Sequence, residues 1–162
     1  MTINAGDRVP DAMLLKMGKA GPELLPIGDL LMGRRVVLFG LPGAFTRTCS
    51  TSHMPSFIRT RAKFVAKGVH EVICVSVNDP FVMHAWGEAT GALAAGITML
   101  ADAASEFTLA AGLAYSAPHL GFANRLKRYA LYAEDGVVKV LHLEDATGVC
   151  DISGGESMLA AI

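Results

Sequence analysis

The sequence predicts an α/β fold in one domain spanning residues 1–162, with a central mixed β-sheet flanked by helices and an N-terminal β extension. Three observations support this. At 162 residues the chain can bury roughly 70% of its unfolded surface. Short apolar runs rich in β-branched residues alternate with segments of helical spacing. Near the C-terminus, two further apolar runs flank Glu134-Asp135-Gly136, a typical hairpin turn.

The first elements follow from composition and spacing. Residues 11–29 are rich in Gly, Pro and scattered Leu, so we expect short strands and turns there. The apolar run 36–40 predicts a strand buried on both faces. After a turn at 41–45, helical spacing predicts a helix over 46–67, which Gly68 ends and Pro55 kinks.

The remaining elements continue the alternation. A buried strand is expected at 72–77, and Asp79-Pro80 is a typical start for a helix that runs toward Gly91. A third strand at 97–100 precedes a short helix over 105–111, capped by Ser105. Hairpin strands at 129–133 and 137–143 and a final helix over 153–162 are expected next. The resulting order of strands and helices is typical of a thioredoxin-like fold.

Composition excludes several classes of function. Lys+Arg number 14 against 15 Asp+Glu, which argues against a dedicated nucleic-acid or lipid-binding surface. Charged residues make up only 18%, which is compatible with a subunit contact. No apolar run approaches the roughly 18 residues of a membrane span, and residues 1–8 lack signal-peptide features. We therefore expect a cytoplasmic protein with no membrane or nucleic-acid partner.

Three cysteines, Cys49, Cys74 and Cys150, are an odd number and lie far apart, which is not the disulfide framework of a secreted module. No Cys-x-x-Cys pair or nucleotide-binding motif is present, so neither structural zinc nor a bound cofactor is expected. His53 follows Cys49 by four residues, a spacing compatible with metal binding, but two ligands are too few.

Cys49 occupies the most informative segment, where a buried strand leads through a turn into a helix. A cysteine in the first helical turn has a lowered pKa, because unpaired N–H groups and the helix dipole stabilise the thiolate. Arg47 adds a nearby cation. The alternative is a small buried hydrophobe, but the carboxyl end of a strand in an α/β sheet is a usual ligand site. Position therefore favours a reactive thiol.

Pro42, Thr46 and Cys49 resemble the P-x-x-x-T-x-x-C signature of peroxiredoxins, which are thiol peroxidases of the redoxin (AhpC/TSA-like) superfamily on a thioredoxin fold. Blocks at 39–57, 74–86 and 127–130 are similar to the atypical two-cysteine, type-five (type II) branch. The resemblance extends from Gly6 to Ile162.

The resemblance implies roles for individual residues. Cys49 would be the nucleophile that becomes a sulfenic acid, with Thr46 hydrogen-bonding the peroxide, Arg128 supplying fixed positive charge and Pro42 shielding the pocket. Without the joint pattern, Thr46 would be read as a helix cap, Pro42 as a turn proline and Arg128 as a strand-end charge. Arg47 stands where the family usually has proline, which leaves the peroxide preference open.

Three thiols are candidates for attacking the sulfenic acid and so resolving it. Cys150, in the loop before the last helix, resembles the resolving position of one group, and Cys74 matches that of another. Local physics favours Cys150, because a loop thiol moves at lower cost than a thiol in a buried strand. In the third candidate, glutathione, glutaredoxin or thioredoxin attacks Cys49 directly.

The leading hypothesis is thus an antioxidant, thiol-dependent peroxidase that reduces hydrogen peroxide and alkyl hydroperoxides at Cys49. It uses no cofactor and an external thiol donor, and the resemblance implies a homodimer. A peroxide-sensing thiol switch that acts on a partner protein is the alternative. A metal site through Cys49 and His53 is a distant third.

Overall fold

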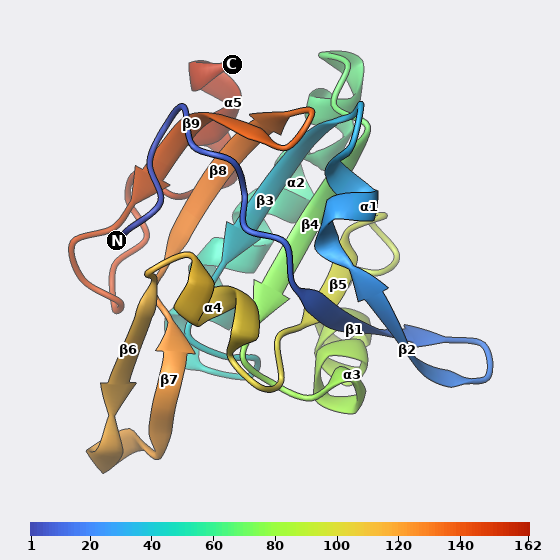
Figure 1. Cartoon of the computed structure of the whole chain (residues 1–162). Helices are drawn as coiled ribbons and strands as arrows, with labels where there is room; N and C mark the ends of the chain where they lie inside the picture. Colours follow the sequence, from blue (N-terminus) through green and yellow to red (C-terminus); the bar gives the residue numbers. More distant parts are fainter.

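A seven-stranded mixed sheet forms the centre of the computed structural model, which describes all residues from 1 to 162 (Figure 1). Its strands are β1 (Met13–Gly18), β2 (Gly21–Pro26), β3 (Arg35–Gly40), β4 (Glu71–Ser76), β5 (Thr98–Ala101), β8 (Tyr129–Glu134) and β9 (Val137–Leu143). They lie in the order β2-β1-β5-β4-β3-β8-β9. The β3–β4 and β4–β5 pairs are parallel and the others antiparallel, which confirms the predicted mixed sheet.

Helices cover both faces of this sheet. They are α1 (Ile27–Leu31), α2 (Met54–Ala66), α3 (Pro80–Thr90), α4 (Glu106–Ala110) and α5 (Gly155–Ala161). Strand β3 shows why its apolar run is continuous: Val36 and Leu38 pack with α1 and α4, whereas Val37 and Phe39 pack with α2, α3 and α5. Figure 1 shows α1 and α4 on one side of the sheet and α2 on the other. None of the helices has the length and apolar character needed to cross a membrane.

A second, two-stranded sheet extends from one end of the main sheet (Figure 1). It consists of β6 (Ala114–Ala117) and β7 (Phe122–Leu126), joined by the 3-10 turn η2 (Pro118–Leu120). No pattern in the sequence predicted this hairpin. Its strands are mostly exposed or half-buried and its register shifts within β6, so they lack a regular apolar alternation. The hairpin leads directly into β8.

The structure corrects two details of the predicted helices. The helix expected over 46–67 is α-helical at 47–48 and then contains a π-turn, η1 (Cys49–His53), and Pro55 lies just after this π-turn, in the first turn of α2. Ser105 does not cap α4, because its hydroxyl donates to Asn124 O. The backbone N–H groups at the start of α4 donate instead to the buried carboxylate of Asp102.

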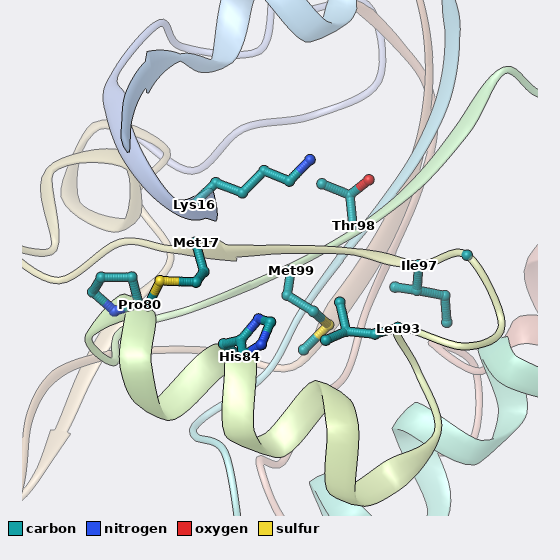
Figure 2. A pocket seen from close by; sticks show the side chains of 9 residues that line it. Lys16, Met17, Pro80, His84, Leu93, Ile97, Thr98 and Met99 are labelled. Carbon is teal, nitrogen blue, oxygen red and sulfur yellow. The ribbon is translucent and has the colours of Figure 1, made fainter. Parts of the chain in front are cut away.

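A cavity of about 200 Å³ lies between β1, β5 and α3 (Figure 2). Lys16, His84 and Thr98 are its polar members, beside apolar side chains that include Met17, Leu93 and Met99. It contains no residue that the sequence analysis selected. The residues selected for chemistry gather elsewhere, around Arg128.

Candidate active site

Arg128 is the centre of a buried polar cluster. Four of its five N–H donors have partners: Nη2 donates to Cys49 Sγ (3.2 Å), Nη1 to His53 Nδ1 (2.9 Å), and Nε and Nη2 to Thr147 O (3.1 and 3.0 Å). The residue is only 2% exposed. Antiparallel pairing of β3 with β8 explains the juxtaposition, because Gly40, which ends β3, lies opposite Tyr129. The structure thus brings together Cys49 and Arg128, which are far apart in the sequence.

Cys49 is fully buried in the first turn of the helix that continues into α2. Two contacts from other elements hold this turn. Trp86 Nε1 in α3 donates to Ser50 Oγ (3.1 Å), and Thr48 Oγ1 donates to Gly148 O (3.1 Å) in the loop that carries Cys150. The π-turn adds one residue to the helix at Cys49, a feature that is frequent at functional sites.

His53 is a neutral partner of Arg128. Burial, and after it the positive charge of Arg128, lowers the pKa of His53 to about 3. Since Nδ1 accepts from Arg128, the proton is on Nε2, which donates to Ser153 O (3.0 Å). From the sequence, His53 was considered as a metal ligand together with Cys49, and no group of three or more His, Cys, Asp or Glu residues that could hold a metal ion is present. Only the fold reveals its contact with Arg128.

Three hydrogen bonds, one internal and two from other elements, hold the loop that carries Pro42 and Thr46. Thr46 Oγ1 donates to Gly43 O (2.7 Å) within the loop. Arg125 Nη1 in β7 donates to Pro42 O (2.9 Å), and the backbone N–H of Ala44 donates to Asn78 Oδ1 (3.0 Å). Arg125 and Asn78 therefore position the loop. Sequence reasoning missed both roles, because nothing in a local pattern shows which loop a distant side chain reaches.

A cavity of about 360 Å³ opens beside this cluster. Pro42, Thr46 and Arg128 are among its lining residues, and the β6–β7 hairpin contributes apolar side chains. The full lining is Pro42, Thr46, Arg47, Thr48, Tyr115, Leu120, Phe122, Arg128, Thr147 and Gly148. The cavity thus contacts three of the four predicted catalytic residues, and the fourth, Cys49, is linked to its wall through Arg128.

The other two cysteines lie in different environments. All three thiols are free. Cys74 is fully buried in β4, and burial raises its pKa well above the usual value. Cys150 is half-buried in the loop before α5, where burial also raises its pKa. Both thiols are therefore protonated at neutral pH in this conformation.

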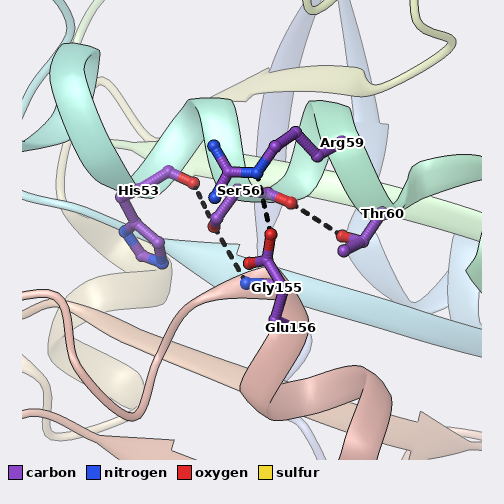
Figure 3. Close-up of polar contacts among 6 residues, drawn as sticks. All are labelled: His53, Ser56, Arg59, Thr60, Gly155 and Glu156. Carbon is purple, nitrogen blue, oxygen red and sulfur yellow. Dashed lines mark hydrogen bonds and ion pairs between the residues drawn. The ribbon is translucent and has the colours of Figure 1, made fainter.

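Helix α5 fixes the far end of the Cys150 loop against α2 (Figure 3). The backbone N–H of Gly155 donates to Ser56 Oγ (2.8 Å), and that hydroxyl donates to His53 O (2.7 Å). An exposed ion pair joins Arg59 to Glu156 (2.8 Å). Backbone and side chain of His53 are therefore both tied, directly or through Ser56, to the segment that follows Cys150.

Comparison with known proteins identifies the family. The redoxin model matches residues 4–159. Peroxiredoxin-2E-2, chloroplastic, of Oryza sativa subsp. japonica is 46% identical over 165 residues, covering 99% of this chain and 73% of that protein. Peroxiredoxin-2C of the same plant is 39% identical, covering 99% and 98%.

A solved structure agrees with these sequence relatives. Reduced Prx3 of Vibrio vulnificus, in complex with H2O2, is 42% identical and covers 99% of both chains with a TM-score of 0.93. The chain therefore belongs to the redoxin family and, within it, to the type II (Prx5-like) peroxiredoxins, which are thiol-dependent peroxidases.

Proposed function

We propose that Cys49 is the thiol that reduces hydrogen peroxide and alkyl hydroperoxides. The observation that carries this assignment is the 3.2 Å contact from Arg128 Nη2 to Cys49 Sγ inside a buried site. The Cys49 thiolate attacks the terminal peroxide oxygen, the S–O bond forms and the O–O bond breaks. The leaving alkoxide or hydroxide takes a proton from solvent, and Cys49, oxidised by two electrons, becomes a sulfenic acid.

The surrounding residues act on the charge that moves during this step. Negative charge passes from sulfur to the leaving oxygen, and the fixed Arg128 guanidinium stabilises it without reorganisation. Thr46 lines the cavity, with its hydroxyl available to the peroxide once it turns from Gly43 O. Pro42 lies in the same wall, where its apolar ring keeps water from the reacting atoms.

The cavity supports a substrate range beyond hydrogen peroxide. Its volume of about 360 Å³ exceeds what a two-oxygen ligand fills, and Tyr115, Leu120 and Phe122 give it an apolar wall. An alkyl chain on the peroxide contacts that wall while the O–O group lies near Arg128. The proposed substrates therefore include small alkyl hydroperoxides.

Cys150 is the proposed resolving thiol. Its loop already contacts the turn of Cys49, because Thr48 Oγ1 donates to Gly148 O. When the loop moves and the Cys150 thiol is released from its half-buried position, it gives up its proton and the thiolate attacks Cys49 Sγ; the disulfide forms, and the departing hydroxide takes up a proton and leaves as water. An external thiol, from thioredoxin, glutaredoxin or glutathione, then reduces the disulfide and returns both cysteines to the thiol form.

A homodimer is proposed from the apolar surface around the site. Phe45, Phe81 and Leu120 are each about 60% exposed. Phe45 adjoins Ala44, whose N–H bonds to Asn78 near Phe81, and Leu120 lines the cavity. Sedimentation of wild type beside Phe81→Asp tests this, with a dimer expected for wild type only. A cytoplasmic location stays a prediction.

The central experiment is intact-mass analysis with peptide mapping after one equivalent of hydrogen peroxide, with Cys49→Ser beside wild type. We expect wild type to lose two hydrogens through a Cys49–Cys150 disulfide and Cys49→Ser to be inert. Full peroxidase activity in Cys49→Ser would overturn the proposal. Fast oxidation of Cys49 followed by slow reduction with every thiol donor would favour the thiol-switch function instead.

A further inference from the structure

Glu144 follows β9 directly and is 8% exposed, yet it belongs to none of the residue patterns that indicated the active site. A single oxygen, Oε1, accepts the backbone N–H groups of Asp151, Ile152 and Ser153 (2.7, 2.7 and 2.8 Å) and the Ser153 hydroxyl (3.0 Å). Its own N–H donates to Arg128 O (3.1 Å). Glu144 thus closes the loop 144–153 with its side chain while its backbone bonds the central arginine.

A chain of hydrogen bonds leads from this carboxylate to the reactive sulfur. Glu144 fixes Ser153, and Ser153 O accepts from His53 Nε2. His53 Nδ1 in turn accepts from Arg128 Nη1, and Arg128 Nη2 donates to Cys49 Sγ. The neutral state of His53 gives the chain one direction of donation. The hydrogen bond to Ser153 O fixes the orientation of the His53 imidazole. The oriented Nδ1 of this ring in turn fixes the Nη1 side of the Arg128 guanidinium.

The same loop holds the other side of the guanidinium. Thr147 O accepts from both Nε and Nη2 of Arg128. The loop 144–153 therefore supplies one acceptor of Arg128, Thr147 O, and holds the imidazole that supplies another, His53 Nδ1, through Ser153 O. Although burial alone would raise the pKa of Glu144, the hydrogen bonds from residues 151–153 lower it, so the carboxylate is charged at neutral pH.

We propose that Glu144 is a positioning residue for the reaction of Cys49 with peroxide, acting through Ser153 and His53 on the direction of the Arg128 guanidinium. This inference rests on the proposed function of Cys49. Without the carboxylate, three backbone N–H groups lose their acceptor and the loop leaves its place. Arg128 then stabilises the moving charge less well, because such stabilisation depends on donors fixed in advance.

The test is the second-order rate constant for oxidation of Cys49 by hydrogen peroxide, from quenched-flow alkylation and peptide mapping without any reductant. We expect Glu144→Ala to lower it about tenfold. Glu144→Gln keeps an acceptor oxygen at the same position, so it should recover part of the loss. Oxidation of Glu144→Ala at the wild-type rate would contradict the inference, whereas an unreactive Cys49 in wild type would contradict the proposed function itself.

Asp102→Asn is the matched control, because Asp102 is also buried and accepts from Phe107 N, Thr108 N and Thr108 Oγ1, but none of its hydrogen bonds reaches Arg128 or His53. We expect it to lower the free energy of unfolding and leave the rate constant within about twofold of wild type. An equal slowing of both variants at equal loss of stability would show general loosening and overturn the inference.

A double-mutant cycle tests the route. His53→Phe keeps a ring beside Phe39 and Phe57 but removes both hydrogen bonds. If Glu144 acts through His53, adding Glu144→Ala to His53→Phe slows the reaction little further. A full tenfold loss in that background would show that Glu144 does not act through His53.

Discussion

The strand that carries Cys74 and the loop that carries Cys150 are fixed by different kinds of contact. Strand β4 lies between β3 and β5, so backbone ladders hold both of its edges, and Cys74 is opposite Phe39 and Met99. The loop 144–153 has no ladder. The Glu144 carboxylate holds its end, and the side chains of Thr48 and Arg128 donate to its carbonyls.

This difference favours Cys150 over Cys74 as the thiol that moves toward Cys49. Releasing a segment held by a few side chains costs those contacts alone, whereas shifting a central strand breaks the sheet on both sides. The loop is therefore the part of the site that can rearrange within a catalytic cycle. The comparison also shows that one loop both carries the proposed resolving thiol and holds Arg128.

The largest expected effect is the contrast between replacing Cys150 and replacing Cys74. We expect Cys150→Ser to abolish the internal disulfide after one equivalent of peroxide, and Cys74→Ser to leave it intact, because only the loop can bring its thiol to Cys49 at low cost. Non-reducing peptide mapping measures this. A disulfide that survives in Cys150→Ser and disappears in Cys74→Ser would reverse the comparison.

Replacement of Arg128 should slow the peroxide reaction by about a hundredfold or more, because a fixed donor at the site of developing charge is lost. Arg128→Lys keeps the charge but cannot donate to Cys49, His53 and Thr147 at once, so it should recover little. Quenched-flow oxidation of Cys49 is the measurement. Lys127→Met removes the neighbouring charge and serves as control, with a near wild-type rate expected.

His53 should make the protein sensitive to acid. Its pKa of about 3 in the fold lies below the unfolded value near 6.5, so the unfolded chain binds the extra proton between these values. The free energy of unfolding therefore falls as pH drops below 6.5, by about 2.5 kcal/mol between pH 6 and 4 from this group.

Urea denaturation across this pH range measures the effect. In His53→Gln this contribution should be absent and the pH dependence correspondingly flatter. The control His119→Gln replaces an exposed histidine and should retain the wild-type slope. Equal slopes in wild type and His53→Gln would mean that His53 is not held neutral by the fold.

The smallest predicted effect concerns the contact of α5 with α2. A Cβ at Gly155 would lie 2.3 Å from Thr60 Oγ1 and 2.5 Å from Ser56 O, so Gly155→Ala should cost about 2 kcal/mol of unfolding free energy. A Cβ at Gly148 meets nothing within 4 Å, so Gly148→Ala should change stability by less than about 0.5 kcal/mol. Thermal unfolding of both variants checks the difference.

Sequence patterns predicted best where a residue's environment follows from its neighbours in the chain. The buried strands, the Asp79 cap, which accepts from Val82 N, and the hairpin turn at 134–136 were all predicted from local spacing. The π-turn at Cys49 was missed, because its extra residue does not change the apolar period enough to be seen. The β6–β7 hairpin was missed because most of its side chains are not fully buried.

The sequence by itself determined the fold class, the peroxiredoxin family and the place of Cys49 at the start of a helix, since these depend on local periodicity and on a compact motif. Only the tertiary structure decided that Arg128 reaches the sulfur, that His53 is its neutral partner and that Glu144 holds the loop. These contacts join residues up to 100 positions apart, and strand pairing and loop closure fix them. A one-dimensional pattern does not carry that information.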